Sequence, residues 1–130
     1  MSHQDAVVWY LRVEHHKTNA VSVLTVTGRI SSLTAPEFEL ALASGVDAPG
    51  GLVLDLTGVD YISSAGLRAV ASAAAALADG GRPFVVCGMT DAVSVAFALA
   101  GLEGSLTIEP TRDDAVARAT STPRAGETAC

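Results

Sequence analysis

The chain has 130 residues, 49% of them hydrophobic, so its size is that of one domain that can bury a core without cross-links. Its formal net charge is −6, and its 8 Lys and Arg residues are scattered along the sequence. Binding to nucleic acid needs clustered cations that displace counterions from phosphates, so this charge balance argues against a nucleic-acid partner.

The first two predicted elements form a β-hairpin. Residues 7–13 and 21–27 are rich in β-branched and aromatic side chains, which is typical of strands. A polar segment, His15 to Asn19, separates the two runs and predicts the turn between them.

A helix and a third strand follow. Thr34-Ala-Pro-Glu37 combines an N-cap threonine, a proline in the first turn and a glutamate three residues after the cap, which predicts the start of a helix. This helix buries Phe38 and Leu42 and ends before the breakers at residues 47–51. The apolar run 52–56 then predicts a short strand covered on both faces.

The second half of the chain alternates helices with strands. Apolar residues recur at helical spacing from Leu67 to Ala78, and Gly80-Gly81 ends that helix. Residues 83–87 predict a fourth strand, and residues 106–108 predict a fifth.

Threonines open the last two predicted helices. Thr90 is a candidate cap for a helix that buries Val93, Ala96, Phe97 and Ala100. Thr111 precedes Asp114 with the spacing of a cap, and the helix that it opens fades near Ala119.

This order of elements predicts an α/β fold. Helical crossovers between parallel strands are right-handed, so we expect a mixed, mostly parallel β-sheet of four to five strands. An N-terminal β-hairpin forms one end of that sheet, and about four α-helices pack against it.

The segment 59–67 is the richest in candidate functional residues. Ser63 and Ser64 lie just ahead of a helix, where unpaired backbone N–H groups and the positive end of the helix dipole favour a negative group such as phosphate. Gly66 lacks a side chain, which would let the backbone of a partner, or a nucleotide, approach Ser64. Serine is also a common N-cap, so plain capping is the alternative.

The string Asp60-Tyr-Ile-Ser-Ser-Ala-Gly-Leu-Arg68, together with the strand before it, resembles the signature segment of STAS domains, in particular of bacterial anti-sigma factor antagonists (anti-anti-sigma factors). The resemblance covers about residues 6–118, because the hairpin, the Gly28-Arg-Ile turn and the strand at 83–87 also fit. It implies a STAS-type fold, with residues 1–118 as the STAS domain and residues 119–130 as a disordered C-terminal tail.

The resemblance also implies a function and a set of site residues. In that family a kinase that is also the anti-sigma factor uses ATP to phosphorylate the serine two residues before the Gly-Leu pair, and Ser64 occupies that position. The unphosphorylated protein would bind this anti-sigma factor and serine protein kinase and so free a sigma factor, and a PP2C-type serine phosphatase would reset it. The partner-binding residues that we expect are Ser31, Asp60, Tyr61, Ser63, Ser64 and Gly66.

Two positions depart from the best-known members of the family. Ser63 stands where those members carry Asp directly before the acceptor, so Ser63 is an alternative phosphoacceptor. Ser31 stands where members commonly carry Asp after the second strand, so any contact between that carboxylate and the kinase is missing.

Two other functions remain open. A STAS interaction module of a transporter or a sensory scaffold would use the same fold, with Ser64 only as a helix cap. An enzyme with Ser64 as its nucleophile would need a base, but the histidines, His3, His15 and His16, lie in the N-terminal region and the hairpin turn. No metal-ligand spacing or phosphate-binding glycine motif is present, so we expect neither catalysis nor a cofactor.

The sequence also bears on where the protein works. Its start lacks the basic, apolar and small-residue regions of a signal peptide, and the longest apolar stretch, 69–78, is too short to span a bilayer. Two cysteines, Cys87 and Cys130, make no disulfide framework, and Cys87 is expected to be a buried small hydrophobe. We therefore expect a cytoplasmic protein with no membrane partner.

Overall fold

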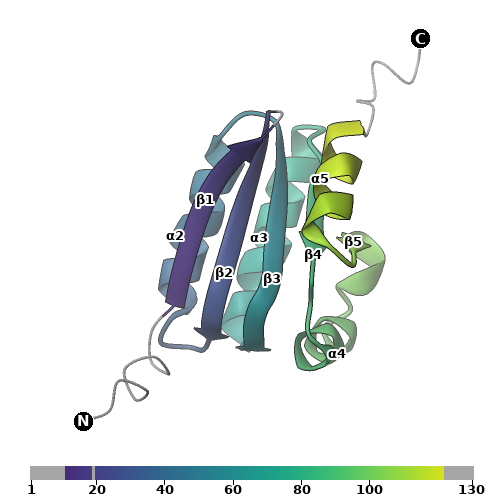
Figure 1. Cartoon of the computed structure of the whole chain (residues 1–130). Coiled ribbons are helices and arrows are strands. Elements are labelled where there is room, and N and C mark those ends of the chain that lie inside the picture. The colour runs from purple at the N-terminus through teal and green to yellow at the C-terminus, as the bar shows by residue number, and fades with distance from the viewer. Residues whose placement is uncertain (1–10, 19, 122–130) are drawn as a thin grey trace.

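The computed structural model describes residues 11–18 and 20–121, which form one sheet with helices on both of its faces (Figure 1). The sheet has five strands in the order β1-β2-β3-β4-β5, and only the β1–β2 pair is antiparallel. The strands are β1 (Leu11–Thr18), β2 (Val21–Ile30), β3 (Gly51–Ile62), β4 (Phe84–Cys87) and β5 (Thr107–Glu109). The predicted mixed α/β sheet is confirmed.

The parallel strands follow one another in sequence order, so right-handed crossovers place their connecting helices on the same face. These helices are α2 (Ala35–Asp47), α3 (Ser64–Asp79) and α4 (Asp91–Leu99), followed by a short 3₁₀ turn, η1 (Glu103–Ser105). The last helix, α5 (Arg112–Ser121), lies on the opposite face, over β3 and β4 (Figure 1).

The two faces of the sheet have separate cores. The larger core lies under α2, α3 and α4 and includes Phe38, Leu54 and Phe97, all fully buried. The smaller core lies under α5 and includes Val53 and Cys87. The central strands β3 and β4 are therefore covered on both sides, as predicted for β3, and Cys87 is the expected buried thiol.

The hairpin turn is shorter than predicted. His15, His16 and Lys17 were expected in the turn, but they belong to β1, which continues to Thr18. An edge strand tolerates polar side chains because much of its surface meets solvent, so a polar run does not end it. The chain reverses instead next to Ala20, whose φ is +65°. The predicted strand residues 7–10 lie outside the described part of the chain.

Thr34 precedes α2, but its hydroxyl does not cap the helix as predicted. The Thr34 hydroxyl donates a hydrogen bond to the carbonyl oxygen of Arg29 (2.6 Å) and accepts one from the amide of Ser31 (2.9 Å). These two hydrogen bonds of the side chain thus go to the end of β2 and the turn after it, and none of the helix amides donates to it. The hydroxyls of Thr90 and Thr111 do accept hydrogen bonds from first-turn amides of α4 and α5, as predicted.

The last helix ends further along the chain than expected. The tail was predicted to start at residue 119, but Ala119 is buried in the smaller core and α5 continues to Ser121. The rest of the predicted tail, residues 122–130, lies outside the described residues. Within the described ranges, the helices are too short or too polar to cross a membrane.

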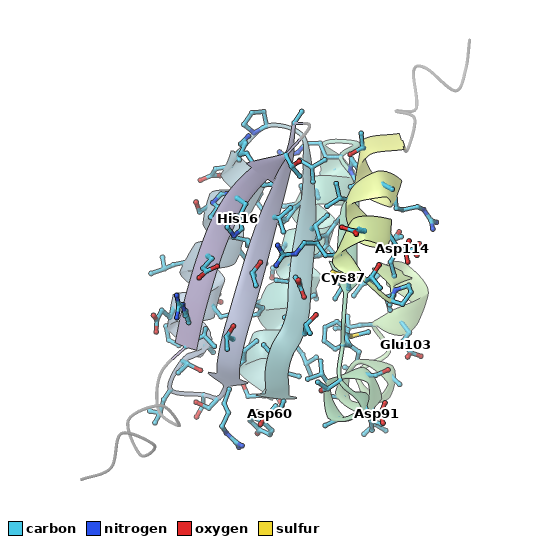
Figure 2. The ribbon with its side chains drawn as sticks, in the orientation of Figure 1. His16, Asp60, Cys87, Asp91, Glu103 and Asp114 are labelled. Carbon is cyan, nitrogen blue, oxygen red and sulfur yellow. The ribbon has the colours of Figure 1, made fainter. Side chains whose placement is uncertain are left out.

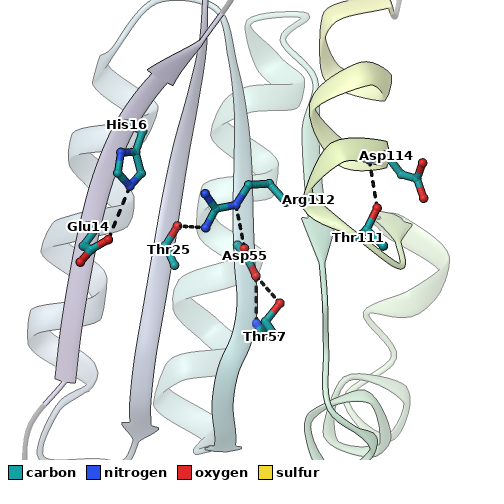
Figure 3. A network of polar contacts seen from close by, with 8 residues as sticks. All are labelled: Glu14, His16, Thr25, Asp55, Thr57, Thr111, Arg112 and Asp114. Carbon is teal, nitrogen blue, oxygen red and sulfur yellow. Dashed lines mark hydrogen bonds and ion pairs between the residues drawn. The ribbon is translucent and has the colours of Figure 1, made fainter.

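An ion pair that the sequence analysis did not single out connects α5 to the sheet (Figure 3). The buried carboxylate of Asp55 on β3 accepts hydrogen bonds from Arg112 Nε (2.9 Å) and from the hydroxyl and amide of Thr57 (2.6 and 3.0 Å). Arg112 also donates to the hydroxyl of Thr25 on β2 (2.6 Å). Burial works against ionisation of Asp55, but the bonds from Thr57 and Arg112 outweigh it and lower its pKa.

This carboxylate predicts a specific dependence of stability on pH. Since the pKa of Asp55 is lower in the folded state than in the unfolded chain (about 3.9), its stabilisation is complete above that pH and disappears as the pH falls through the folded-state pKa. Asp55→Asn should lower the free energy of unfolding at pH 7 by about 1–2 kcal/mol, measured by urea denaturation.

The control is Asp60→Asn, which removes the same charge from an exposed position on the same strand and should change little. The difference in stability between the wild type and Asp55→Asn should shrink in acid. A difference that stays constant down to strongly acidic pH would contradict the assignment.

Candidate functional site

The candidate site lies where β2 and β3 end, at one edge of the sheet. Ile30 and Ile62 are register partners, and the amide of Ser63 donates a hydrogen bond to the carbonyl oxygen of Ile30 (2.7 Å). β3 was predicted to end at Leu56, but it continues through Asp60, which lies near its end (Figure 2). The long strand brings the predicted residues after β2 and those after β3 to the same edge.

The two serines have different roles. Ser63 is half-buried with an extended backbone, and its hydroxyl accepts a hydrogen bond from the amide of Gly66 (3.2 Å), so it is the N-cap of α3. Ser64 is the first residue of the helix and is exposed. None of the described residues forms a hydrogen bond with its side chain. The alternative in which Ser64 caps the helix is therefore wrong, because Ser63 occupies that position.

The start of α3 is suited to a negative group. Its first turn contains no acidic residue, so neither Asp nor Glu compensates the positive end of the helix dipole. A phosphate on Ser64 would lie beside the first amides of the helix, where anions are stabilised.

Gly66 has a packing role that differs from the predicted one. It is buried, and a Cβ atom at this position would lie 2.6 Å from Cγ2 of Ile30 and 2.8 Å from Cγ1 of Ile62. The missing side chain lets the first turn of α3 rest on the ends of β2 and β3. The expectation that Gly66 opens a path toward Ser64 from outside is wrong, because its free side faces the core.

The other predicted residues line the same edge. The Ser31 hydroxyl accepts hydrogen bonds from the amides of Leu33 (3.2 Å) and Thr34 (3.4 Å), so it organises the turn between β2 and α2. Asp60 and Tyr61 are exposed on β3, and the guanidinium carbon of Arg29 lies 4.7 Å from the centre of the Tyr61 ring, a cation–π contact. The structure thus brings Ser31, Asp60, Tyr61, Ser63 and Ser64 to one edge.

A shallow apolar groove between α3 and the segment after α4 adjoins this edge. Its volume is about 250 Å³, and it is lined by Ser64, Leu67, Arg68, Ala71, Ala100 and Leu102. Ala100 was predicted to be buried, but it lies just past the last turn of α4 and is exposed. The apolar spacing in the sequence marks which helix faces are apolar, and it does not reveal a groove between a helix and a segment that follows another helix.

Leucines near the site are unusually exposed. Leu33, in the turn after β2, is 73% exposed, and Leu99, at the end of α4, is 85% exposed. Exposed apolar side chains around a functional edge favour protein contact over small-molecule binding. The sequence pattern does not identify either residue, because the exposure of a leucine in a turn or at a helix end depends on how the elements pack around it.

The described residues offer no catalytic arrangement around Ser64. His16 lies on β1 and approaches Glu14 (3.6 Å, Figure 3). In the described part of the chain, neither His15 nor His16 forms a hydrogen bond with Ser64. His3 lies outside the described residues. Within residues 11–18 and 20–121, no group of three His, Cys, Asp or Glu side chains is arranged to hold a metal ion.

Comparison with known proteins gives consistent matches. The model of the STAS domain family matches residues 10–115. BtrV of Bordetella bronchiseptica, named as an anti-sigma factor antagonist, is 31% identical over 82% of this chain and 93% of its own. The anti-sigma-F factor antagonist RsfB of Mycobacterium tuberculosis is 40% identical over 42% of this chain and 45% of its own. The crystal structure of an anti-sigma factor antagonist from Mycobacterium paratuberculosis superposes with a TM-score of 0.73 at 30% identity, covering 84% of this chain and 93% of that one.

The packing role of Gly66 can be tested by a single methyl group. Gly66→Ala should lower the free energy of unfolding by about 1–3 kcal/mol, because the new Cβ has no room beside Ile30 and Ile62. Gly104→Ala is the matched control, since a Cβ at Gly104 meets no atom within 4 Å. Urea denaturation measures the free energy of unfolding of both variants. Equal values would show that Gly66 does not pack against Ile30 and Ile62 as described.

Proposed function

The chain belongs to the STAS domain family, within its anti-sigma factor antagonists, and on this premise we propose that it is a partner switch controlled by phosphorylation of Ser64. Members of this group are regulators and not enzymes. In the proposed cycle, the unphosphorylated chain binds an anti-sigma factor that is also a serine kinase, and a sigma factor is released. Phosphorylation ends this binding, and a PP2C-type phosphatase restores it.

The observation that carries the proposal is the free hydroxyl of Ser64. It is exposed at the start of α3 beside an apolar groove, and no described residue bonds to it. The rival acceptor, Ser63, is half-buried and its oxygen already accepts the Gly66 amide. A kinase that modified Ser63 would have to break this cap, which costs about 1 kcal/mol. These contacts favour Ser64 over Ser63 as the phosphoacceptor.

The proposed modification is an ordinary phosphoryl transfer. Oγ of Ser64 attacks the γ-phosphorus of ATP bound to the kinase, a new O–P bond forms, and the bond from that phosphorus to the ADP oxygen breaks. The hydroxyl proton passes to a base of the kinase. In the reverse direction, the phosphatase uses water to attack the phosphorus, which leaves inorganic phosphate and the free hydroxyl.

The effect of the phosphate on binding follows from charge and hydration. The modification adds about −1.5 to −2 charges at pH 7 in the middle of the proposed contact surface. A coupling free energy of about 1–3 kcal/mol between phosphorylation and binding changes the affinity about 5- to 150-fold. Ser64 lies on a helix held against two strands, so the proposal needs no large conformational change.

An interaction module of a transporter or sensory scaffold is the competing function within the same family. It needs no modification of Ser64, so the experiments below separate it from the switch.

The first experiment identifies the acceptor. Incubation with a cognate serine kinase and ATP should add one phosphoryl group to the wild type and to Ser63→Ala, and none to Ser64→Ala, because only Ser64 offers a free hydroxyl. Intact-mass and fragment-ion spectrometry locate the group. If Ser64→Ala were phosphorylated at Ser63, the phosphoacceptor would be Ser63 and the proposal would have named the wrong serine. If neither the wild type nor any variant were phosphorylated, the result would favour the scaffold module.

The second experiment measures the consequence for binding. Ser64→Ala should co-purify with the kinase at the wild-type level, whereas Ser64→Asp should lose at least several-fold in occupancy because it carries a charge into the contact surface. Ser72→Asp, which adds the same charge about two turns further along the exposed side of α3, is the matched control and should bind like the wild type. Equal binding by all variants would contradict the switch.

A further inference from the structure

Arg68 lies one helical turn after Ser64 and shares the groove between α3 and the segment after α4 with it. We propose that Arg68 holds the phosphate of phosphorylated Ser64, so that the modification also closes this groove to the partner. The inference rests on the proposed phosphorylation of Ser64, and it assigns to Arg68 a positioning role that adds to the effect of charge alone.

The spacing of the two residues suits this contact. Residues i and i+4 of a helix lie on one face with their Cβ atoms about 5–6 Å apart, and Ser64 and Arg68 have this spacing within α3. Both side chains are exposed, so neither has to leave a packed position to reach the other. An acidic group that precedes a basic one at this spacing is the favourable order on a helix.

Arg68 differs from the other described arginines in having no partner. Arg12 pairs with Glu14, Arg112 with Asp55, and Arg118 with Glu109. Arg82 donates to three backbone carbonyls, and Arg29 stacks on Tyr61. Within residues 11–18 and 20–121, nothing forms a hydrogen bond, an ion pair or a ring contact with Arg68. The chain has a net charge of −6, and Arg68, beside the proposed acceptor, is a cation with no ion pair among the described residues, so it is available to bind a phosphate.

The chemistry of the two groups is complementary. A guanidinium binds phosphate oxygens through two parallel N–H···O hydrogen bonds, which makes arginine the preferred side chain for this group. The uncompensated start of α3 adds a favourable field from the other side of the phosphate. A phosphate on Ser64 would therefore lie between the helix amides and Arg68.

The contact would change the shape of the surface as well as its charge. The apolar part of the groove consists of Leu67, Ala71, Ala100 and Leu102. While Ser64 is unmodified, Arg68 is free to move aside and the groove can receive an apolar side chain of the partner. Once Arg68 is drawn toward the phosphate, its aliphatic stem lies along the groove and competes with that side chain.

The test uses phosphoserine incorporated genetically at position 64, which needs no kinase. The second pKa of a phosphoserine is about 6, and a cation held beside it lowers this value because it favours the dianion. A titration followed by ³¹P NMR should give a pKa about half a unit lower in the phosphorylated wild type than in phosphorylated Arg68→Gln. Lys17→Gln, which removes the same charge from the opposite end of the β1–β2 hairpin, should leave the phosphate pKa at the wild-type value.

Methyl NMR provides a second readout in the same samples. Phosphorylation should shift the methyl signals of Leu67 and Leu102 in the wild type, and this shift should be largely lost in Arg68→Gln. Identical phosphate titrations and identical methyl shifts in the wild type and Arg68→Gln would overturn the role of Arg68. That result would overturn only the role of Arg68 and would not affect the outcome expected of the kinase and co-purification experiments. Failure of those two experiments would instead contradict the proposed switch itself.

Discussion

The hydrogen bond from the Ser63 amide to the Ile30 carbonyl determines where the functional edge lies. It joins the end of β3 to the end of β2 at 2.7 Å and makes Ser63 the last extended residue before α3. Gly66 can then pack its bare backbone against Ile30 and Ile62, with no side chain between helix and sheet. The roles of the two serines follow from this junction, because it determines which serine caps the helix and which one faces solvent.

The junction separates the residues that stabilise the fold from the proposed phosphoacceptor. Ser63 caps α3 and Gly66 lets its first turn pack against β2 and β3, and the Asp55–Arg112 pair holds α5 on the opposite face of the sheet. Ser64 takes part in none of these contacts, so adding a phosphate to it disturbs no interaction that holds the described part of the chain together. A residue whose side chain makes no stabilising contact can be phosphorylated while the fold stays intact. A partner switch requires such a residue, because its charge must change without unfolding the protein.

Local patterning predicted most of the fold, and long-range contacts account for what it missed. The buried strands and the helix around Val70 follow from apolar spacing that a sequence displays directly. The Thr34 hydroxyl accepts its hydrogen bond from the Ser31 amide in place of a helix amide and donates to the Arg29 carbonyl, and the end of β2 places both partners. The extension of β3 to Ile62 depends on its pairing with β2, and the Asp55–Arg112 pair joins residues far apart in the chain. The serine pair was recognisable from its signature, but the division of roles between its members is a property of the folded junction.

The central claim is that one exposed hydroxyl at the start of α3 controls binding of the anti-sigma factor kinase. Calorimetric titration of the kinase with the wild-type chain, in its unmodified form and in a form stoichiometrically phosphorylated on Ser64, tests this most directly. The account predicts tight binding of the unmodified form and an affinity about 5- to 150-fold lower for the phosphorylated form, with the circular dichroism of the two forms unchanged. Equal affinities of the two forms would contradict it.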